Sequence, residues 1–433
     1  QGVGISTVDT VNRDVSYSLT GKDVDAVIID GGIGAVHPEF LDAEGKTRVK
    51  DLVLDGPFEV DPDYFTGIGV TYNKVVDSVD IGVGIATTSA EEWWENASKR
   101  SAKFSSLGTL SIDQNYTLSQ ALSKAYIPSE ALIPVSDNHG TACAAQVGGK
   151  SFGLAFECNI WNIRATFGGI GYMGTDTALN ACTIWHNAKK INSTDPNPTI
   201  INNSWGRTSS TGNTSATTYN HHYRGNNLTY TGSGNVEIIP SNAGACRNNK
   251  TFTVNSGAGS QTFKYNESGQ YNTGLPSTNS AAENLIAAGA IVVASAGNTN
   301  QKMCDKDDVD FGNWYSSSSN YTNRALGLQQ GFSGDHEKHK GTIRVGALDC
   351  SVEPADEKQG VTKYSVRKVC YSANGPMIDI WAPGEKTMAA GYSTNENYQR
   401  TDDTNFYDAW HNGTSAACPN ACSVIALYLQ SNR

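Results

Sequence analysis

The feature that most constrains the fold of this chain is a repeated alternation of short apolar runs with helical segments. Several apolar runs end in a polar residue or a glycine-rich turn, as in DVDAVIIDGGIG at 23–34 and AIVVASAGN at 290–298. Continuous apolar runs of this length are typical of strands buried on both faces of a parallel sheet. The alternation therefore predicts an α/β fold in which helices cover both faces of a mainly parallel sheet.

The remaining predicted elements follow the same alternation. Further strands are predicted at 159–165, 198–206, 342–349 and 375–384. Helices are predicted at 136–149, 175–189, 281–289 and 414–431. We interpret 1–433 as a single domain with polar insertions at about 52–130, 207–278 and 300–340. Alternating segments in the second insertion, such as TFTVNS, predict antiparallel β structure there.

Composition narrows the class of partner. The net charge of −11 argues against nucleic acid or an anionic membrane as the main partner. The longest apolar stretch, near 285–297, is too short and too interrupted by glycine to span a bilayer. The nine cysteines show neither a CxxC pair nor a Cys/His cluster at zinc spacing. Most of them are expected to be small buried residues, with one or two disulfides left open.

Three polar residues stand at element ends and together suggest acyl-transfer chemistry. Asp30 ends a strand, His139 begins a helix, and Ser415 begins another. A serine hydroxyl needs an imidazole to accept its proton and a carboxylate to orient that imidazole. Asn298, at the end of AIVVASAGN, and the Ser415 N–H at a helix N-terminus are candidate donors to an oxyanion.

Six segments in this order resemble those of the subtilisin-like serine protease family, the subtilases. They are DGGI with HPEF (30–33 and 37–40), HGTACAAQVGG (139–149), INNSWG (201–206), VVASAGN (292–298), YSANGPMIDIWAPG (371–384) and GTSAACP (413–419). The resemblance implies a three-layer α/β sandwich and a serine endopeptidase acting through an acyl-enzyme. It assigns Ser415 as nucleophile, His139 as general base and acid, Asp30 as its orienting group, and Asn298 as oxyanion donor. Ser204, Trp205 and Gly206 would bind the substrate backbone as an added strand.

The acidic run after Asn298 has several interpretations. In the family this region approaches the primary specificity pocket, so a carboxylate there would select Arg or Lys. A calcium loop and a solvated surface are the alternatives. The residues concerned are Asp305, Asp307, Asp308 and Asp310. The chemistry requires no cofactor. A structural calcium ion is left open without a defined site: by the resemblance, Glu39 stands where the family has a ligand, but its loop is short.

Other functions remain open at this point. The chain could be a binding or structural module of a larger assembly that keeps a protease fold and acts only on itself or a partner. An esterase is the third option, although INNSWG supplies a peptide-binding edge that an esterase does not need. The expected partner is a polypeptide substrate, with a pro-segment or assembly partner as a further option. The start at Gln1 suggests processing, so we expect a secreted or extracellular protein, or a component of a virion or other assembly.

Overall fold

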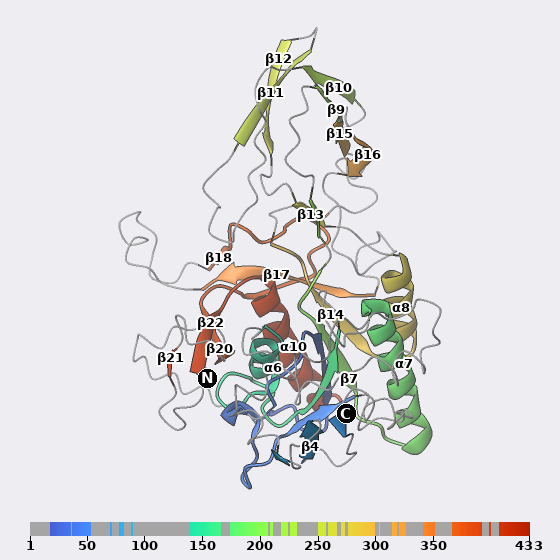
Figure 1. Ribbon diagram of the computed structural model, residues 1–433, viewed down its shortest axis with the longest axis vertical. Coiled ribbons are helices and arrows are strands. Elements are labelled where there is room, and N and C mark those ends of the chain that lie inside the picture. The colour runs from blue at the N-terminus through green and yellow to red at the C-terminus, as the bar shows by residue number, and fades with distance from the viewer. Residues whose placement is uncertain are drawn as a thin grey trace.

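The structure is a computed structural model, and the ranges that it describes contain the predicted α/β core. These ranges are 18–35, 37–52, 139–165, 174–206, 276–298, 303, 341–350, 366–391 and 407–433, with the backbone of short strands outside them. Strands and helices of this core follow one another in the predicted order (Figure 1).

An eight-stranded sheet forms the centre of the molecule. Its order is β18-β17-β14-β7-β1-β6-β2, with β19 beside β17, and only β18 runs antiparallel to its neighbour. The strands are β1 (Asp25–Asp30), β2 (Val49–Asp51), β6 (Asn159–Arg164), β7 (Thr199–Asn203), β14 (Ile291–Ser295), β17 (Ile343–Asp349), β18 (Arg367–Lys368) and β19 (Ile380–Pro383). Strand β1 lies between β6 and β7, so its carboxyl end is at the middle of the sheet.

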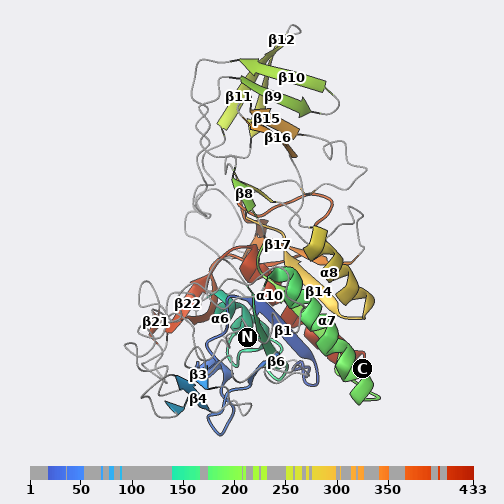
Figure 2. The same ribbon diagram turned by 45° about the vertical axis from the view of Figure 1, so that its right-hand side comes forward.

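Helices cover both faces of this sheet, as predicted. They are α6 (His139–Gly148), α7 (Thr175–Asn192), α8 (Pro276–Ala287) and α10 (Thr414–Ser431), with a short 3-10 helix η1 (Pro38–Phe40). Alternate residues of β1 divide between the faces. Ala26 and Ile28 pack in the cluster that includes α6 and α10, whereas Val27 and Ile29 pack in the cluster that includes α7 and α8. The result is a three-layer sandwich (Figure 2).

Several boundaries differ from the prediction, and at two elements the start moves by five residues. Helix α8 begins at Pro276, five residues before the predicted start, because proline at a first helical position is compatible with a polar first turn. The predicted strand 375–384 is reduced to β19, since only Ile380–Pro383 pairs with β17.

The antiparallel β structure predicted within 207–278 is confirmed. Its strands are β8 (Thr208–Ser210), β9 (Thr218–Tyr223), β10 (Asn226–Thr231), β11 (Lys250–Ser256), β12 (Gly259–Tyr265) and β13 (Gln270–Asn272). Strand β9 also pairs with β15 (Trp314–Ser317), which pairs with β16 (Asn320–Ala325). The insertions at 207–278 and 300–340 therefore share one four-stranded sheet, at the upper end of Figure 1.

The remaining strands form two small sheets. They are β3 (Val70–Thr71), β4 (Ser78–Ile81) and β5 (Thr88–Ser89) in one, and β20 (Thr387–Gly391), β21 (Tyr398–Gln399) and β22 (Tyr407–His411) in the other. Strand β22 leads through Asn412 and Gly413 directly into α10. It therefore brings its last residue, His411, close to the start of that helix.

Candidate active site

Asp30 is delivered by the carboxyl end of β1. Its side chain is buried, and its Oδ1 accepts the N–H of Gly31 at 2.8 Å. The start of α6 packs directly against this turn. A Cβ added at Gly140 would lie 2.2 Å from the carbonyl oxygen of Gly32, so only glycine permits this approach of helix to strand end.

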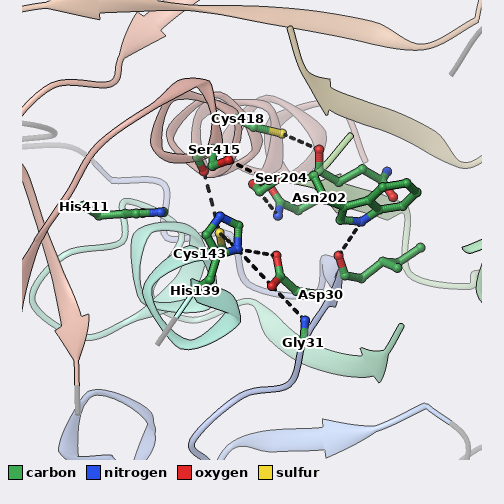
Figure 3. Close-up of polar contacts among 12 residues, drawn as sticks. Asp30, Gly31, His139, Cys143, Asn202, Ser204, His411, Ser415 and Cys418 are labelled. Carbon is green, nitrogen blue, oxygen red and sulfur yellow. Dashed lines mark hydrogen bonds and ion pairs between the residues drawn. The ribbon is translucent and has the colours of Figure 1, made fainter. Parts of the chain in front are cut away.

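His139 is the first residue of α6 and faces Asp30 (Figure 3). Its Nδ1 lies 2.9 Å from Oδ1 and 3.0 Å from Oδ2 of that carboxylate. Burial disfavours the imidazolium, but the Asp30 charge and hydrogen bond, with Cys143 beside the ring, outweigh it and hold the pKa of His139 well above its ordinary value. The predicted pairing of histidine and aspartate is therefore present in the structure.

Ser415 is the second residue of α10, after Thr414, and the helix follows Gly413, whose φ is 109°. The Sγ of Cys143 lies 4.0 Å from Nδ1 of His139 and 3.6 Å from the backbone oxygen of Ser415. One buried thiol therefore contacts both residues, and Figure 3 shows them side by side. The hydroxyl of Ser415 donates to the carbonyl oxygen of Ser204 at 2.6 Å.

Asn298 lies three residues after β14, beside the same helix start. Its Oδ1 accepts the N–H of Thr414 at 2.8 Å and the Thr414 hydroxyl at 2.9 Å. An atom that accepts twice must be the amide oxygen, so the amide nitrogen is on the other side, available as a donor. Because Ser415 is at a helix start, its N–H has no intrahelical acceptor four residues back. Both predicted oxyanion donors are thus at one end of α10.

Ser204, Trp205 and Gly206 follow directly after β7. The indole N–H of Trp205 donates to the carbonyl oxygen of Ile29 at 2.8 Å, and the ring is buried. This bond fixes the segment to β1, next to the strand end that carries Asp30. The Ser204 carbonyl is the group of this segment that contacts Ser415.

Sequence reasoning did not single out the side chains that pack behind His139. His411, at the end of β22, stacks edge-on against the His139 ring with centroids 5.4 Å apart. Its Nδ1 lies 2.9 Å from Oε1 of Gln146. Burial, with the charge of His139, lowers the pKa of His411 to about 3, so this second imidazole is neutral. The only sequence signal was its position in HNGTS, four residues before Ser415.

Most cysteines are buried free thiols, as predicted. Cys143, Cys158, Cys182, Cys418 and Cys422 are buried and free, Cys350 is partly exposed and free, and Cys370 is disulfide-bonded. Cys418 and Cys422 contact Asn203 and Asn202 of β7 from one side of α10. These two cysteines therefore share one helical face.

The remaining candidates are the four aspartates of the acidic run and Glu39. Asp305, Asp307, Asp308 and Asp310 lie outside the described residues. Oε2 of Glu39 accepts the N–H of Ser151 at 2.7 Å. The guanidinium of Arg48 donates to the carbonyl oxygens of Gly148 at 2.7 Å and Phe156 at 2.8 Å. The Arg48 guanidinium therefore lies beside Glu39, with a longer contact of 3.4 Å to the carbonyl oxygen of that residue.

Comparison with known proteins gives one family match and several distant structural matches. A protein-family model described as "Subtilase family" matches residues 21–433 of the chain. A solved structure described as a cold adapted subtilisin-like serine proteinase is 16% identical, with 97% of this chain and 80% of that chain covered and a TM-score of 0.40. Another, Sphericase, is 14% identical, with 97% and 82% covered and a TM-score of 0.40. No curated protein matches. Among the described residues, no helix is both long and apolar enough to cross a bilayer.

Proposed function

This chain belongs to the subtilase family of serine proteases, and from that premise we propose that it is an endopeptidase that hydrolyses peptide bonds through an acyl-enzyme on Ser415. The observation that carries the proposal is the pairing of His139 Nδ1 with both carboxylate oxygens of buried Asp30, beside Ser415. This pairing turns the other ring nitrogen, Nε2, away from Asp30, where it can accept a proton.

The first chemical step is attack by Oγ of Ser415 on the scissile carbonyl carbon. His139 accepts the hydroxyl proton, and the Asp30 carboxylate stabilises the imidazolium that forms. The tetrahedral oxyanion receives hydrogen bonds from the Asn298 amide and the Ser415 N–H. His139 then donates its proton to the leaving amine, and water repeats the sequence to release the acid.

Substrate binding is coupled to the position of the nucleophile. Without substrate, the Ser415 hydroxyl donates to the Ser204 carbonyl at 2.6 Å. A peptide that adds as a strand along Ser204–Gly206 brings a backbone N–H to the same carbonyl. Loss of that acceptor favours rotation of the Ser415 hydroxyl toward His139, so substrate binding prepares the attack.

Labelling with a fluorophosphonate probe, which phosphonylates an activated serine, tests the proposal. The wild-type chain is compared with Ser415→Ala and with Ser431→Ala, a matched change at the exposed end of the same helix. We expect labelling of the wild type and of Ser431→Ala, but not of Ser415→Ala. Peptide cleavage should follow the same pattern. A folded wild type that neither labels nor cleaves peptides would overturn the proposal.

The proposal includes a location outside the cytoplasm. Cys370 is disulfide-bonded, and disulfides persist mainly in oxidising compartments. Fractionation of the producing cells tests this part. We expect to detect the chain in the medium or in an exported compartment. Retention of all the chain in the cytoplasm with Cys370 reduced would contradict this part.

A further inference from the structure

Three side chains with soft or nitrogen donor atoms meet behind the proposed nucleophile. His139 and Cys143 are four residues apart on α6, and His411 comes from the end of β22 (Figure 3). One ring nitrogen of each histidine and Sγ of Cys143 all lie within 4.8 Å of one another. No Cys/His pattern at zinc spacing exists in the sequence, because the third member joins the other two only in the folded chain.

His411 has an available donor atom that the protein does not use. Its Nε2 is buried and has no hydrogen-bond partner among the described residues, and the residue as a whole is 9% exposed. A buried polar atom without a partner costs free energy, so its persistence calls for a physical explanation. In Figure 3 the nitrogen-bearing edge of this ring faces His139.

The hydrogen bonds around Gln146 fix which nitrogen of His411 carries the proton. The Thr387 hydroxyl donates to the carbonyl oxygen of His411 at 2.6 Å, so Thr387 Oγ1 must accept from Nε2 of Gln146. The Gln146 amide oxygen therefore faces Nδ1 of His411 at 2.9 Å and requires an N–H there. Nε2 is left with its lone pair. A histidine whose other nitrogen donates to a fixed acceptor is the usual arrangement at metal sites.

We propose that His139, Cys143 and His411 form an inhibitory binding site for a borderline-soft divalent cation, with Zn²⁺ as the metal that these ligands fit best. Two imidazoles and one thiolate, with solvent as a fourth ligand, are a donor set that zinc accepts. Zinc displaces the proton of the Cys143 thiol to solvent as the Zn–S bond forms. The side chain of His139 is 36% exposed, which leaves a path for the ion.

The geometry requires only a small adjustment. Zinc binds sulfur at about 2.3 Å and imidazole nitrogen at about 2.0–2.1 Å, so the ligand atoms of one thiolate and two imidazoles stand roughly 3.3–3.6 Å apart. Separations of up to 4.8 Å therefore close with side-chain rotation.

A metal at this site stops the proposed reaction. Nε2 of His139 is the proposed proton acceptor, and Nδ1 is the nitrogen that Asp30 orients. Whichever nitrogen the ion takes, the base is lost from the reaction. Zinc would thus act as a reversible inhibitor. This consequence for activity rests on the proposed function, whereas metal binding itself does not.

Cobalt absorption measures binding without any need for activity. The full chain carrying Ser415→Ala, freed of metal by a chelator, is titrated with Co²⁺, whose thiolate complexes absorb in the near ultraviolet. We expect a thiolate–cobalt band that Zn²⁺ abolishes by displacement. Cys143→Ser should eliminate the band. His411→Leu should weaken cobalt binding at least about 100-fold, because loss of a residue that only hydrogen-bonds to a ligand typically costs 10–100-fold. Cys350→Ser, which removes another free thiol, is the matched control and should keep the band.

Zinc inhibition of the chain with Ser415 intact completes the test. Zinc should inhibit peptide cleavage, and a chelator should restore it. For Cys143→Ser and His411→Leu, the zinc concentration that halves the variant's own uninhibited rate should be at least about 100-fold higher than for the wild type. Absence of the cobalt band, a band that survives in folded Cys143→Ser, or an unchanged cobalt affinity in folded His411→Leu would overturn the site. Because the two variants lie on different elements, failure of one to fold leaves the other as a test. A cobalt band in a chain that never cleaves peptides would keep the metal site and overturn the proposed function.

Discussion

Thr414 holds the side-chain amide of Asn298 through two hydrogen bonds to the same atom. Its N–H and its hydroxyl both donate to Oδ1, at 2.8 and 2.9 Å. The same hydroxyl accepts the N–H of Gly297 at 3.0 Å. One threonine next to the proposed nucleophile thus connects the loop after β14 to the start of α10 and orients a donor that would otherwise rotate.

Replacement of Asn298 by alanine should lower kcat by about 10²–10³, the loss typical of one oxyanion donor, which is a figure measured on subtilisin itself. KM should change little, because the oxyanion exists only in the transition state. Steady-state kinetics on a chromogenic peptide measure both constants. A variant with wild-type kcat would show that Asn298 does not contact the reacting oxygen.

Thr414→Val removes the hydroxyl but keeps the branched shape and the N–H. It leaves the buried Gly297 N–H unpaired, at a cost of about 1–3 kcal/mol in stability. It also releases the Asn298 amide, so kcat should fall more than KM rises. Thr414→Ser keeps the hydroxyl and should retain most of the rate. If Thr414→Val and Thr414→Ser reduce kcat equally, the Thr414 hydroxyl has no role in orienting the Asn298 amide.

Asp30→Asn should change both the rate and its pH dependence. The carboxylate raises the pKa of His139, so wild-type activity should fall as pH decreases through that raised value, where His139 becomes protonated and cannot accept a proton. Without the charge, the His139 pKa decreases and the acid limb of kcat/KM moves to lower pH. The rate itself should drop by about 10⁴. Glu44→Gln, an exposed carboxylate change, is the control. An unshifted acid limb would contradict the role of Asp30.

Gly140→Ala tests the close approach of α6 to the end of β1. The new Cβ would lie 2.2 Å from the Gly32 carbonyl oxygen and 3.0 Å from Cβ of Asp30, neither of which can turn away. Helix α6 must shift, and His139 shifts with it. A displacement near 1 Å can cost about 10²-fold in rate, so we expect at least that loss in kcat/KM. Gly174→Ala meets the carboxylate of Asp176, which can turn away, at 2.8 Å and the Thr177 hydroxyl at an ordinary 3.7 Å, so it should be nearly neutral.

Arg48→Ala should destabilise the fold without contact with the reacting groups. The guanidinium satisfies the carbonyl oxygens of Gly148, at the end of α6, and Phe156. Its loss removes both hydrogen bonds, which should cost about 1–3 kcal/mol in the free energy of unfolding. Denaturant melts in the Ser415→Ala background avoid self-digestion. Lys46→Ala, an exposed neighbouring cation, should change stability by less than about 0.5 kcal/mol. Equal effects of the two would refute the structural role of Arg48.

The sequence by itself determined the order of the core elements and the positions of Asp30, His139 and Ser415. Strand period, helix starts and turn residues are local properties, so DVDAVIIDGG could be recognised as a strand that delivers a carboxylate. Element boundaries were less well determined where pairing sets them. Strand β19 is shorter than predicted because its length depends on β17, a partner that local sequence does not specify.

Tertiary structure alone decided which nonlocal groups surround these residues. His411 meets His139 and Cys143 because β22 pairs with β20, which packs against α6, and nothing in HNGTS encodes that contact. The orientation of the Asn298 amide and the raised pKa of His139 also depend on partners more than a hundred residues away. Hydrogen bonds and charge interactions act over a few ångströms of space, whereas sequence patterns record only spacing along the chain.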